Sequence, residues 1–140
     1  MVVYRLIHSR KLPHRWQETK MIGYFDSETQ CKKTIDQLLM QPGFRDYPDR
    51  FCIIPCRTPD APEETALDTV YEVTAEKEIN DFDSYVSYLG VYAQEASAEN
   101  RVKKCMKRIE NKAGTEFYVI DYRINEVLWN EGFDVVEYSE

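Results

Sequence analysis

The chain has no long apolar run and few glycines, and these shortages argue against several classes of protein. No apolar stretch approaches the roughly 20 residues that a helix needs to cross a bilayer. The N-terminus has no basic segment followed by an apolar one, so we expect no signal peptide and a cytoplasmic location. The five glycines form neither Gly-x-Gly nor Gly-Lys-Ser/Thr, the patterns typical of phosphate-binding loops.

Cysteine and histidine are too sparse and too dispersed to predict a metal centre or thiol catalysis. The four cysteines form no Cys-x-x-Cys pair, and His8 and His14 are the only histidines. Cys52 and Cys56 lie on one expected strand, where a rise of ~3.3 Å per residue separates their Cα atoms by about 13 Å, too far for a disulfide. We therefore expect reduced core thiols, no bound metal, no cofactor and no catalytic residues, and hence a protein that is not an enzyme.

Negative charge is abundant and is concentrated in the second half of the chain. The net charge is −7. Residues 1–67 hold 10 Lys/Arg and 9 Asp/Glu, whereas residues 68–140 hold 8 and 16. Such a surface is expected to repel nucleic acid and anionic membranes and to attract a basic protein. One stretch of the second half, residues 101–112, is basic, and it can either touch phosphates or neutralise neighbouring acidic loops.

Two parts of the chain resemble each other at a spacing of 66 to 67 residues. The matching stretches are Val3-Tyr4-Arg5-Leu6 with Val70-Tyr71-Glu72-Val73, Met21-Ile22-Gly23 with Tyr88-Leu89-Gly90, and Phe51-Cys52-Ile53-Ile54 with Phe117-Tyr118-Val119-Ile120. An internal repeat constrains the architecture before any local pattern does. We infer two related units, each with the element order β-β-α-β.

The first unit is expected to span residues 1–58. Its strands are predicted at residues 2–8, 18–25 and 51–57. Ser27, with Gln30 three residues later, predicts a capping box at the start of a helix that Pro42-Gly43 ends. Pro55 favours an edge position for the last strand.

A polar linker, residues 59–69, is expected to precede a second unit that spans residues 70–140. Its elements are predicted as strands at 70–75, 85–92 and 116–123, a helix at 97–112, and a tail from residue 126 that contains a short strand at 134–138. The predicted fold class is α+β, with the two repeats packed as one compact pseudo-two-fold domain, mainly antiparallel sheet with helices on one face.

Two motifs resemble those of a family of small bacterial proteins of unknown function. The stretch from Gly43 to Phe51 fits Gly-Phe-Arg-x-x-Pro-x-x-Phe, and the stretch from Trp129 to Phe133 fits Trp-x-x-Gly-Phe. In that family both motifs belong to one unit, whereas here the first unit has only the Gly-Phe-Arg motif and the second unit has only the Trp-x-x-Gly-Phe ending. The resemblance implies an internally duplicated form of the family's fold and implies no particular activity.

These features together favour a non-enzymatic, acidic protein-binding module. Most concretely we expect a bacterial immunity or antitoxin-like inhibitor of a basic toxin or nuclease, a monomer or weak homodimer that contacts neither nucleic acid nor membrane. The expected partner-binding residues are acidic loop and tail positions with one aromatic anchor: Asp81, Asp83, Glu126, Trp129, Glu131 and Asp134.

Other functions and another role for the tail are open at this point. A phage-type inhibitor of a host defence nuclease would use the same acidic surface to mimic the charge of nucleic acid. A small-molecule-binding domain or an enzyme would use a cleft between the repeats. Trp129 and Phe133 flank a glycine, so they can also form a structural clasp that holds the tail against the sheet.

Overall fold

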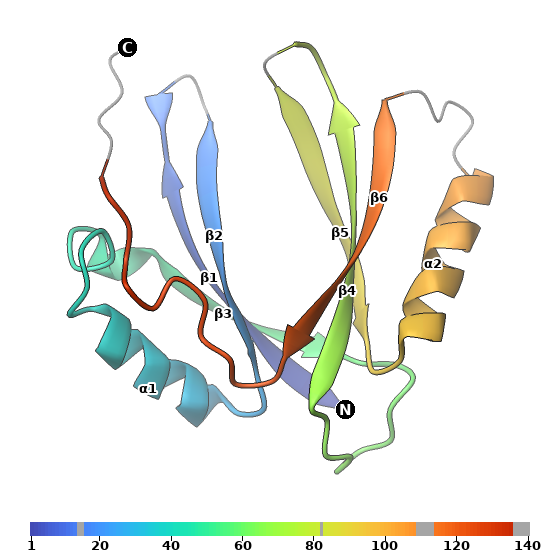
Figure 1. Ribbon diagram of the computed structural model, residues 1–140, viewed down its shortest axis with the longest axis horizontal. Helices are drawn as coiled ribbons and strands as arrows, with labels where there is room; N and C mark the ends of the chain where they lie inside the picture. Colours follow the sequence, from blue (N-terminus) through green and yellow to red (C-terminus); the bar gives the residue numbers. More distant parts are fainter. Residues whose placement is uncertain (14–15, 82, 109–113, 136–140) are drawn as a thin grey trace. The chain divides into compact units, whose positions relative to one another are not determined.

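The computed structural model describes the whole chain except residues 14–15, 82, 109–113 and 136–140. The described part is an α+β protein with two three-stranded antiparallel sheets (Figure 1). Its elements are β1 (Val2–Lys11), β2 (Gln17–Phe25), α1 (Glu28–Leu38), the 3-10 helix η2 (Pro48–Arg50), β3 (Phe51–Arg57), β4 (Thr69–Glu78), β5 (Ser84–Tyr92), α2 (Glu95–Arg108) and β6 (Thr115–Arg123). Among the described residues, no helix combines the length and the apolar character needed to cross a membrane.

The contacts within the chain divide it into two compact units. Unit A consists of Val3–Pro55 and the segment that begins at Ile124, and unit B consists of Met1–Val2 and Cys56–Arg123. The sequence prediction drew other boundaries, because it assigned the tail to the second unit and treated residues 59–69 as a linker. The tail joins unit A because its apolar side chains pack there, a long-range contact that local periodicity does not reveal.

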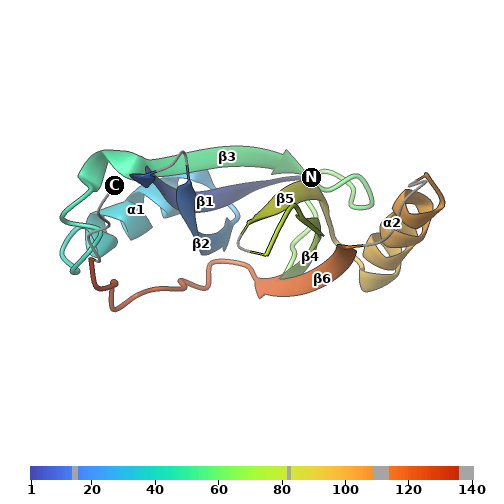
Figure 2. The same ribbon diagram turned by 90° about the horizontal axis from the view of Figure 1, so that it is seen from above.

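The sheet of unit A has the strand order β2-β1-β3, with α1 on one face (Figure 2). The edge position of β3 confirms the prediction from Pro55, which cannot donate a backbone hydrogen bond to a second neighbour. The start of α1 is also as predicted, because the Ser27 side chain accepts a hydrogen bond of 3.1 Å from the Gln30 amide.

The core of unit A contains side chains from both ends of the chain. Its buried residues are Leu6, Ile22, Phe25, Cys31, Leu38, Phe44 and Phe133. The Phe44 ring stacks on Phe51 at 5.4 Å and meets Phe133 edge-on at 5.1 Å. A Cβ atom on Gly43, whose φ is +83°, would lie 2.6 Å from the Phe133 ring. The two motifs that are far apart in the sequence therefore meet in one core.

Several elements extend beyond their predicted ends because their polar residues find partners across the sheet. β1 continues past residue 8 to Lys11, where Arg10 pairs in register with Glu18. β4 continues past residue 75 to Glu78, and Glu76 accepts a hydrogen bond of 2.9 Å from the Ser84 hydroxyl. The predicted helix end at 112 and the predicted strand at 134–138 fall mostly outside the described residues, and 134–135 are irregular.

The sheet of unit B has the strand order β5-β4-β6, and α2 packs across all three strands. In both sheets the first strand of the unit is central. A bulge follows the pair Leu6–Gly23 between β1 and β2, and another follows the pair Val73–Gly90 between β4 and β5. These positions are 67 residues apart, the spacing of the sequence similarity.

Candidate functional site

Residues 129–132 form a tight turn on the surface of unit A. The Gly132 amide donates a hydrogen bond of 2.9 Å to the Trp129 carbonyl, which closes the turn. On one side the Leu128 amide donates to Ile22 at 2.8 Å, and on the other the Phe133 amide donates to Pro42 at 2.9 Å. A Cβ atom on Gly132 would lie 2.2 Å from the Pro42 carbonyl oxygen. The turn is therefore fixed closely against the loop that follows α1.

The two aromatic residues of this turn have different environments. Phe133 is 9% exposed and belongs to the core, whereas Trp129 is 46% exposed. Trp129 also has a φ of +61°, a left-handed conformation that bulky side chains rarely adopt. Holding such a residue there costs of order 1–3 kcal/mol. Phe133 is thus the clasp that holds the tail, and Trp129 presents its indole to solvent.

The predicted partner-binding residues are divided between the two units. Glu126, Glu131 and Asp134 lie with Trp129 on the tail of unit A, and all three are exposed. Asp81 and Asp83 lie between β4 and β5 in unit B. Asp83 helps to shape this hairpin, since its amide and its carboxylate form hydrogen bonds of 2.9 and 3.3 Å with the Asn80 side chain.

A charged cluster that the sequence reasoning did not name lies beside the tail turn. We call it the Glu18 cluster; it consists of Arg10, Glu18, Lys20 and Tyr47. The Glu18 carboxylate accepts hydrogen bonds from Lys20 and, at 3.3 Å, from Arg10. Arg10 also donates a hydrogen bond of 2.9 Å to the Tyr47 hydroxyl. The Lys20 ammonium lies 3.9 Å from the Phe133 ring centre and 5.2 Å from that of Trp129, so the cluster contacts the turn directly.

The Glu18 cluster buries two cations around one carboxylate. Arg10 is 7% exposed and Lys20 is 9% exposed. Burial alone would raise the pKa of Glu18, but the hydrogen bonds from Lys20 and Arg10 lower its pKa below the ordinary value. Glu18 is therefore ionised at neutral pH, and the cluster leaves a net positive charge next to the Trp129 and Phe133 rings.

His8 is enclosed beside the same cluster. It is 1% exposed, and its Nε2 donates a hydrogen bond of 3.0 Å to the Tyr47 carbonyl. Three aromatic rings surround it, those of Phe44, Phe51 and Phe133. Burial lowers the pKa of His8, and the nearby charges of Lys20 and Arg10 lower it further, against the raising effects of the Tyr47 hydrogen bond and the Glu18 carboxylate. The neutral ring packs within the core, while His14 lies outside the described residues.

A signal for this cluster is present in the sequence. Leu6, His8 and Arg10 alternate along β1, and all three are buried. Polar residues at alternate positions on the buried face of a strand need hydrogen-bond or charge partners in the interior, because an unpaired buried charge is strongly destabilising. Arg10 finds its partner opposite on β2, where Glu18 pairs with it in register, and His8 finds its partner in the Tyr47 carbonyl.

The four cysteines are free thiols in three different environments. Cys31 and Cys56 are buried, which confirms the prediction of core thiols for these two, whereas Cys105 is partly buried and Cys52 is exposed. Burial, with the nearby charges of Glu28 and Asp26, raises the pKa of Cys31 to about 11. Within the described part of the chain, no three His, Cys, Asp or Glu residues are placed to hold a metal ion.

Comparison of the chain with protein-family models, with curated proteins and with solved structures gives no match. The resemblance to a family of small bacterial proteins stays a prediction.

Proposed function

We propose that this chain is a non-enzymatic protein-binding module in which Trp129 is the anchor and Glu126, Glu131 and Asp134 form a charged rim. The observation that carries the proposal is the conformation of Trp129, a 46% exposed side chain held at a φ of +61° between two anchored neighbours. Strained residues of this kind persist where the surrounding structure forces them, and they cluster at functional sites. Tryptophan is also enriched among the residues that dominate binding energy in protein interfaces.

The charge of the rim favours a basic partner. The chain carries a net charge of −7, and the exposed charged residues on the tail are acidic, while Lys20, the cation next to the indole, is buried. The most specific form of the proposal is an immunity or antitoxin-like inhibitor of a basic toxin or nuclease, since complementary charge accelerates association in a salt-dependent way. An inhibitor of a host defence nuclease would use the same surface, and competition by DNA for the partner distinguishes the two.

The proposal is tested with three variants of matched design. Trp129→Gly removes the anchor, Glu131→Lys reverses a rim charge, and Asp36→Lys makes the same reversal at an exposed position of α1. Each variant is used as bait for affinity capture, and a captured protein is then purified and titrated. We expect a basic protein that wild type and Asp36→Lys bind alike, and that Trp129→Gly binds about tenfold or more weakly, as for a hot-spot residue.

Salt dependence separates the anchor from the rim. Glu131→Lys should slow association and reduce its dependence on ionic strength, whereas Trp129→Gly should mainly accelerate dissociation. Equal affinity of the partner for all three variants and wild type contradicts the assignment of this surface. In that case Asp81→Lys, in the hairpin of unit B, tests whether Asp81 and Asp83 form the contact on their own.

We also propose that the two units are copies of one ancestral β-β-α-β unit. The support is the central position of the first strand in both sheets and the bulges that lie 67 residues apart. Of the two units, unit A holds the tail, so it would present the contact surface while unit B diverged. Single-unit homologues that align with both halves would support this origin, and homologues that align with one half alone would contradict it. The predicted pseudo-two-fold packing stays a prediction.

A further inference from the structure

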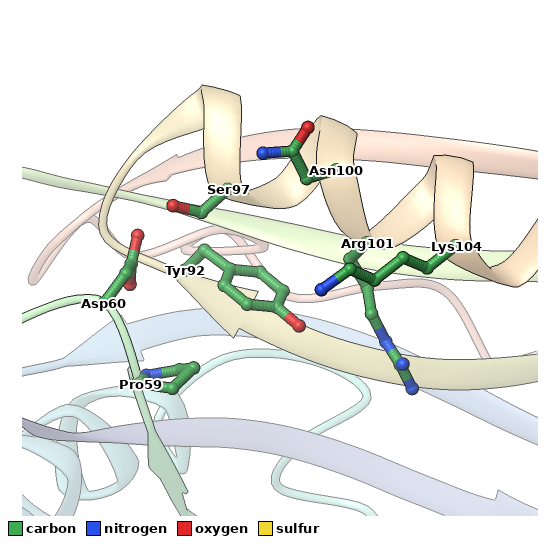
Figure 3. Close-up of a pocket in the computed structure, with 7 residues that line it drawn as sticks. All are labelled: Pro59, Asp60, Tyr92, Ser97, Asn100, Arg101 and Lys104. Atoms are coloured by element: carbon green, nitrogen blue, oxygen red, sulfur yellow. The ribbon is translucent and has the colours of Figure 1, made fainter.

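Unit B contains a pocket that the proposed protein-binding surface does not use (Figure 3). It has a volume of about 350 Å³ and lies between the first turns of α2 and the segment that precedes β4. Tyr92 and Pro59 contribute an aromatic ring and an apolar ring, and α2 contributes polar and basic side chains. This volume is within the range of small-molecule sites, roughly 300–1,000 Å³.

Asp60 connects the loop to the helix at one end of the pocket. Its carboxylate accepts hydrogen bonds from the Ala93 amide at 2.7 Å and from the Gln94 amide at 2.9 Å. Burial alone would raise the pKa of Asp60, but hydrogen bonds from Ala93, Ser97 and Gln94 together lower it. The carboxylate is therefore ionised, and the amides at the start of α2 stabilise its charge. Asp60 thus fixes one wall of the pocket.

The other end of the pocket is positively charged. Figure 3 shows the Tyr92 ring between Asp60 on one side and the side chains of Arg101 and Lys104 on the other. The Arg101 Nε donates a hydrogen bond of 3.3 Å to the Leu89 carbonyl, which orients the guanidinium and leaves its terminal amino groups for a ligand. In the part of the chain that the structure describes, neither Arg101 nor Lys104 forms an ion pair with a carboxylate.

We propose that this pocket binds a small molecule in which an oxyanion, a carboxylate or a phosphate, is attached to a planar ring. Arg101 and Lys104 are three residues apart on α2, so both can reach one anion. A guanidinium can bind two oxygens of a carboxylate or phosphate at once. The planar part would lie against the Tyr92 ring, and the Asn100 side chain would offer hydrogen bonds to its edge. The site is independent of the proposed partner surface on unit A.

The test uses four simple probes and one pair of lysine variants on the full-length chain. The probes are phenyl phosphate, benzoate, inorganic phosphate and phenol, each titrated while amide chemical shifts are recorded by NMR. Lys104→Gln removes a charge from the pocket, and Lys103→Gln removes the same charge from an exposed neighbour on the same helix that does not line the pocket. We expect phenyl phosphate or benzoate to bind about tenfold more tightly than phenol, because charge-assisted hydrogen bonds are the strong ones.

The lysine variants decide whether the pocket or the whole basic helix is responsible. We expect Lys104→Gln to weaken binding about fivefold and Lys103→Gln to change it less than about twofold, because Lys104 lines the pocket and Lys103 does not, and an exposed charge outside the site contributes little. Equal loss in both variants, or no shifts at Tyr92 and Ser97 with millimolar probe, overturns the proposal. Inorganic phosphate that binds as tightly as phenyl phosphate overturns the stacking on Tyr92. A single-stranded oligonucleotide is tested in the same way. If it binds wild type more tightly than any probe does, and if Lys103→Gln and Lys104→Gln weaken its binding equally, the helix binds nucleic acid and the pocket proposal is overturned.

Discussion

The ammonium group of Lys20 lies 3.9 Å from the centre of the Phe133 ring. Lys20 belongs to β2 and Phe133 to the tail, so this contact joins the Glu18 cluster to the turn that carries Trp129. Apolar packing alone would place Phe133 in the core. The Lys20 ammonium against the face of the Phe133 ring adds a directional contact. The position of the exposed Trp129 indole therefore depends on both the apolar packing of Phe133 and its contact with Lys20.

Two substitutions in the turn should have different effects on stability. Trp129→Gly removes a bulky residue from a φ of +61°, and we expect it to leave the free energy of unfolding unchanged or to raise it by up to about 1 kcal/mol. Gly132→Ala places a Cβ 2.2 Å from the Pro42 carbonyl, and we expect a loss of more than about 1 kcal/mol. Urea unfolding measures both. A large destabilisation by Trp129→Gly would show that the indole is a structural element and would count against a role in binding.

The clasp should be the most sensitive position of the tail. Phe133→Ala removes a 9% exposed ring from the core of unit A, and we expect a loss of about 3–5 kcal/mol. Val135→Ala, at a 36% exposed position two residues later, is the control and should change stability by less than about 0.5 kcal/mol. Thermal unfolding that responds alike to both would mean that the tail does not contribute to the core.

His8 should make stability depend on pH. Its pKa in the folded state is lowered from the ordinary value of 6.5, so the unfolded chain binds the proton more readily. The contribution of neutral His8 to the free energy of unfolding is therefore fully present above about pH 6.5, and it is lost as the pH falls toward the folded-state pKa. His8→Gln should reduce this slope between pH 7 and 5 in urea titrations. His14→Gln is the control, and an equal effect there would contradict the assignment to His8.

The thiols should react in an order that their environments set. Cys52 is exposed, whereas Cys31 is buried with a pKa raised to about 11, so little thiolate is present at neutral pH. We expect iodoacetamide to modify Cys52 in the folded protein and Cys31 only after unfolding, as mass spectrometry of digested peptides can show. Rapid labelling of Cys31 in native buffer would require α1 to open locally.

The order of the secondary-structure elements could be predicted because each of them has a strong local signal. Ser27 marked the start of α1, and Pro55 marked β3 as an edge strand. The strand ends were less accurate, since Arg10 and Glu76 are polar and look like loop residues until their cross-strand partners are known. Local patterns therefore predicted the elements, and tertiary partners decided their length.

The candidate site was predicted only in part. Trp129 and its acidic neighbours are conspicuous in the sequence, but the division of roles between Trp129 and Phe133 depends on which ring reaches the core. The Glu18 cluster was missed because a charged residue is assigned to the surface by default. Its members lie on three separated segments, and only the register of β1 with β2 and the loop that carries Tyr47 bring them together.

The division of unit A between two distant segments has a consequence for how the protein is made. Residues 3–55 leave the ribosome early, but the ring of Phe133 that completes their core is synthesised after the whole of unit B. Unit B has all but its first two residues in one continuous stretch and can fold as soon as it has emerged. Unit A, most of which is synthesised first, is therefore the last to be completed, and a ribosome that stops just after residue 123 releases a complete unit B joined to an unfinished unit A.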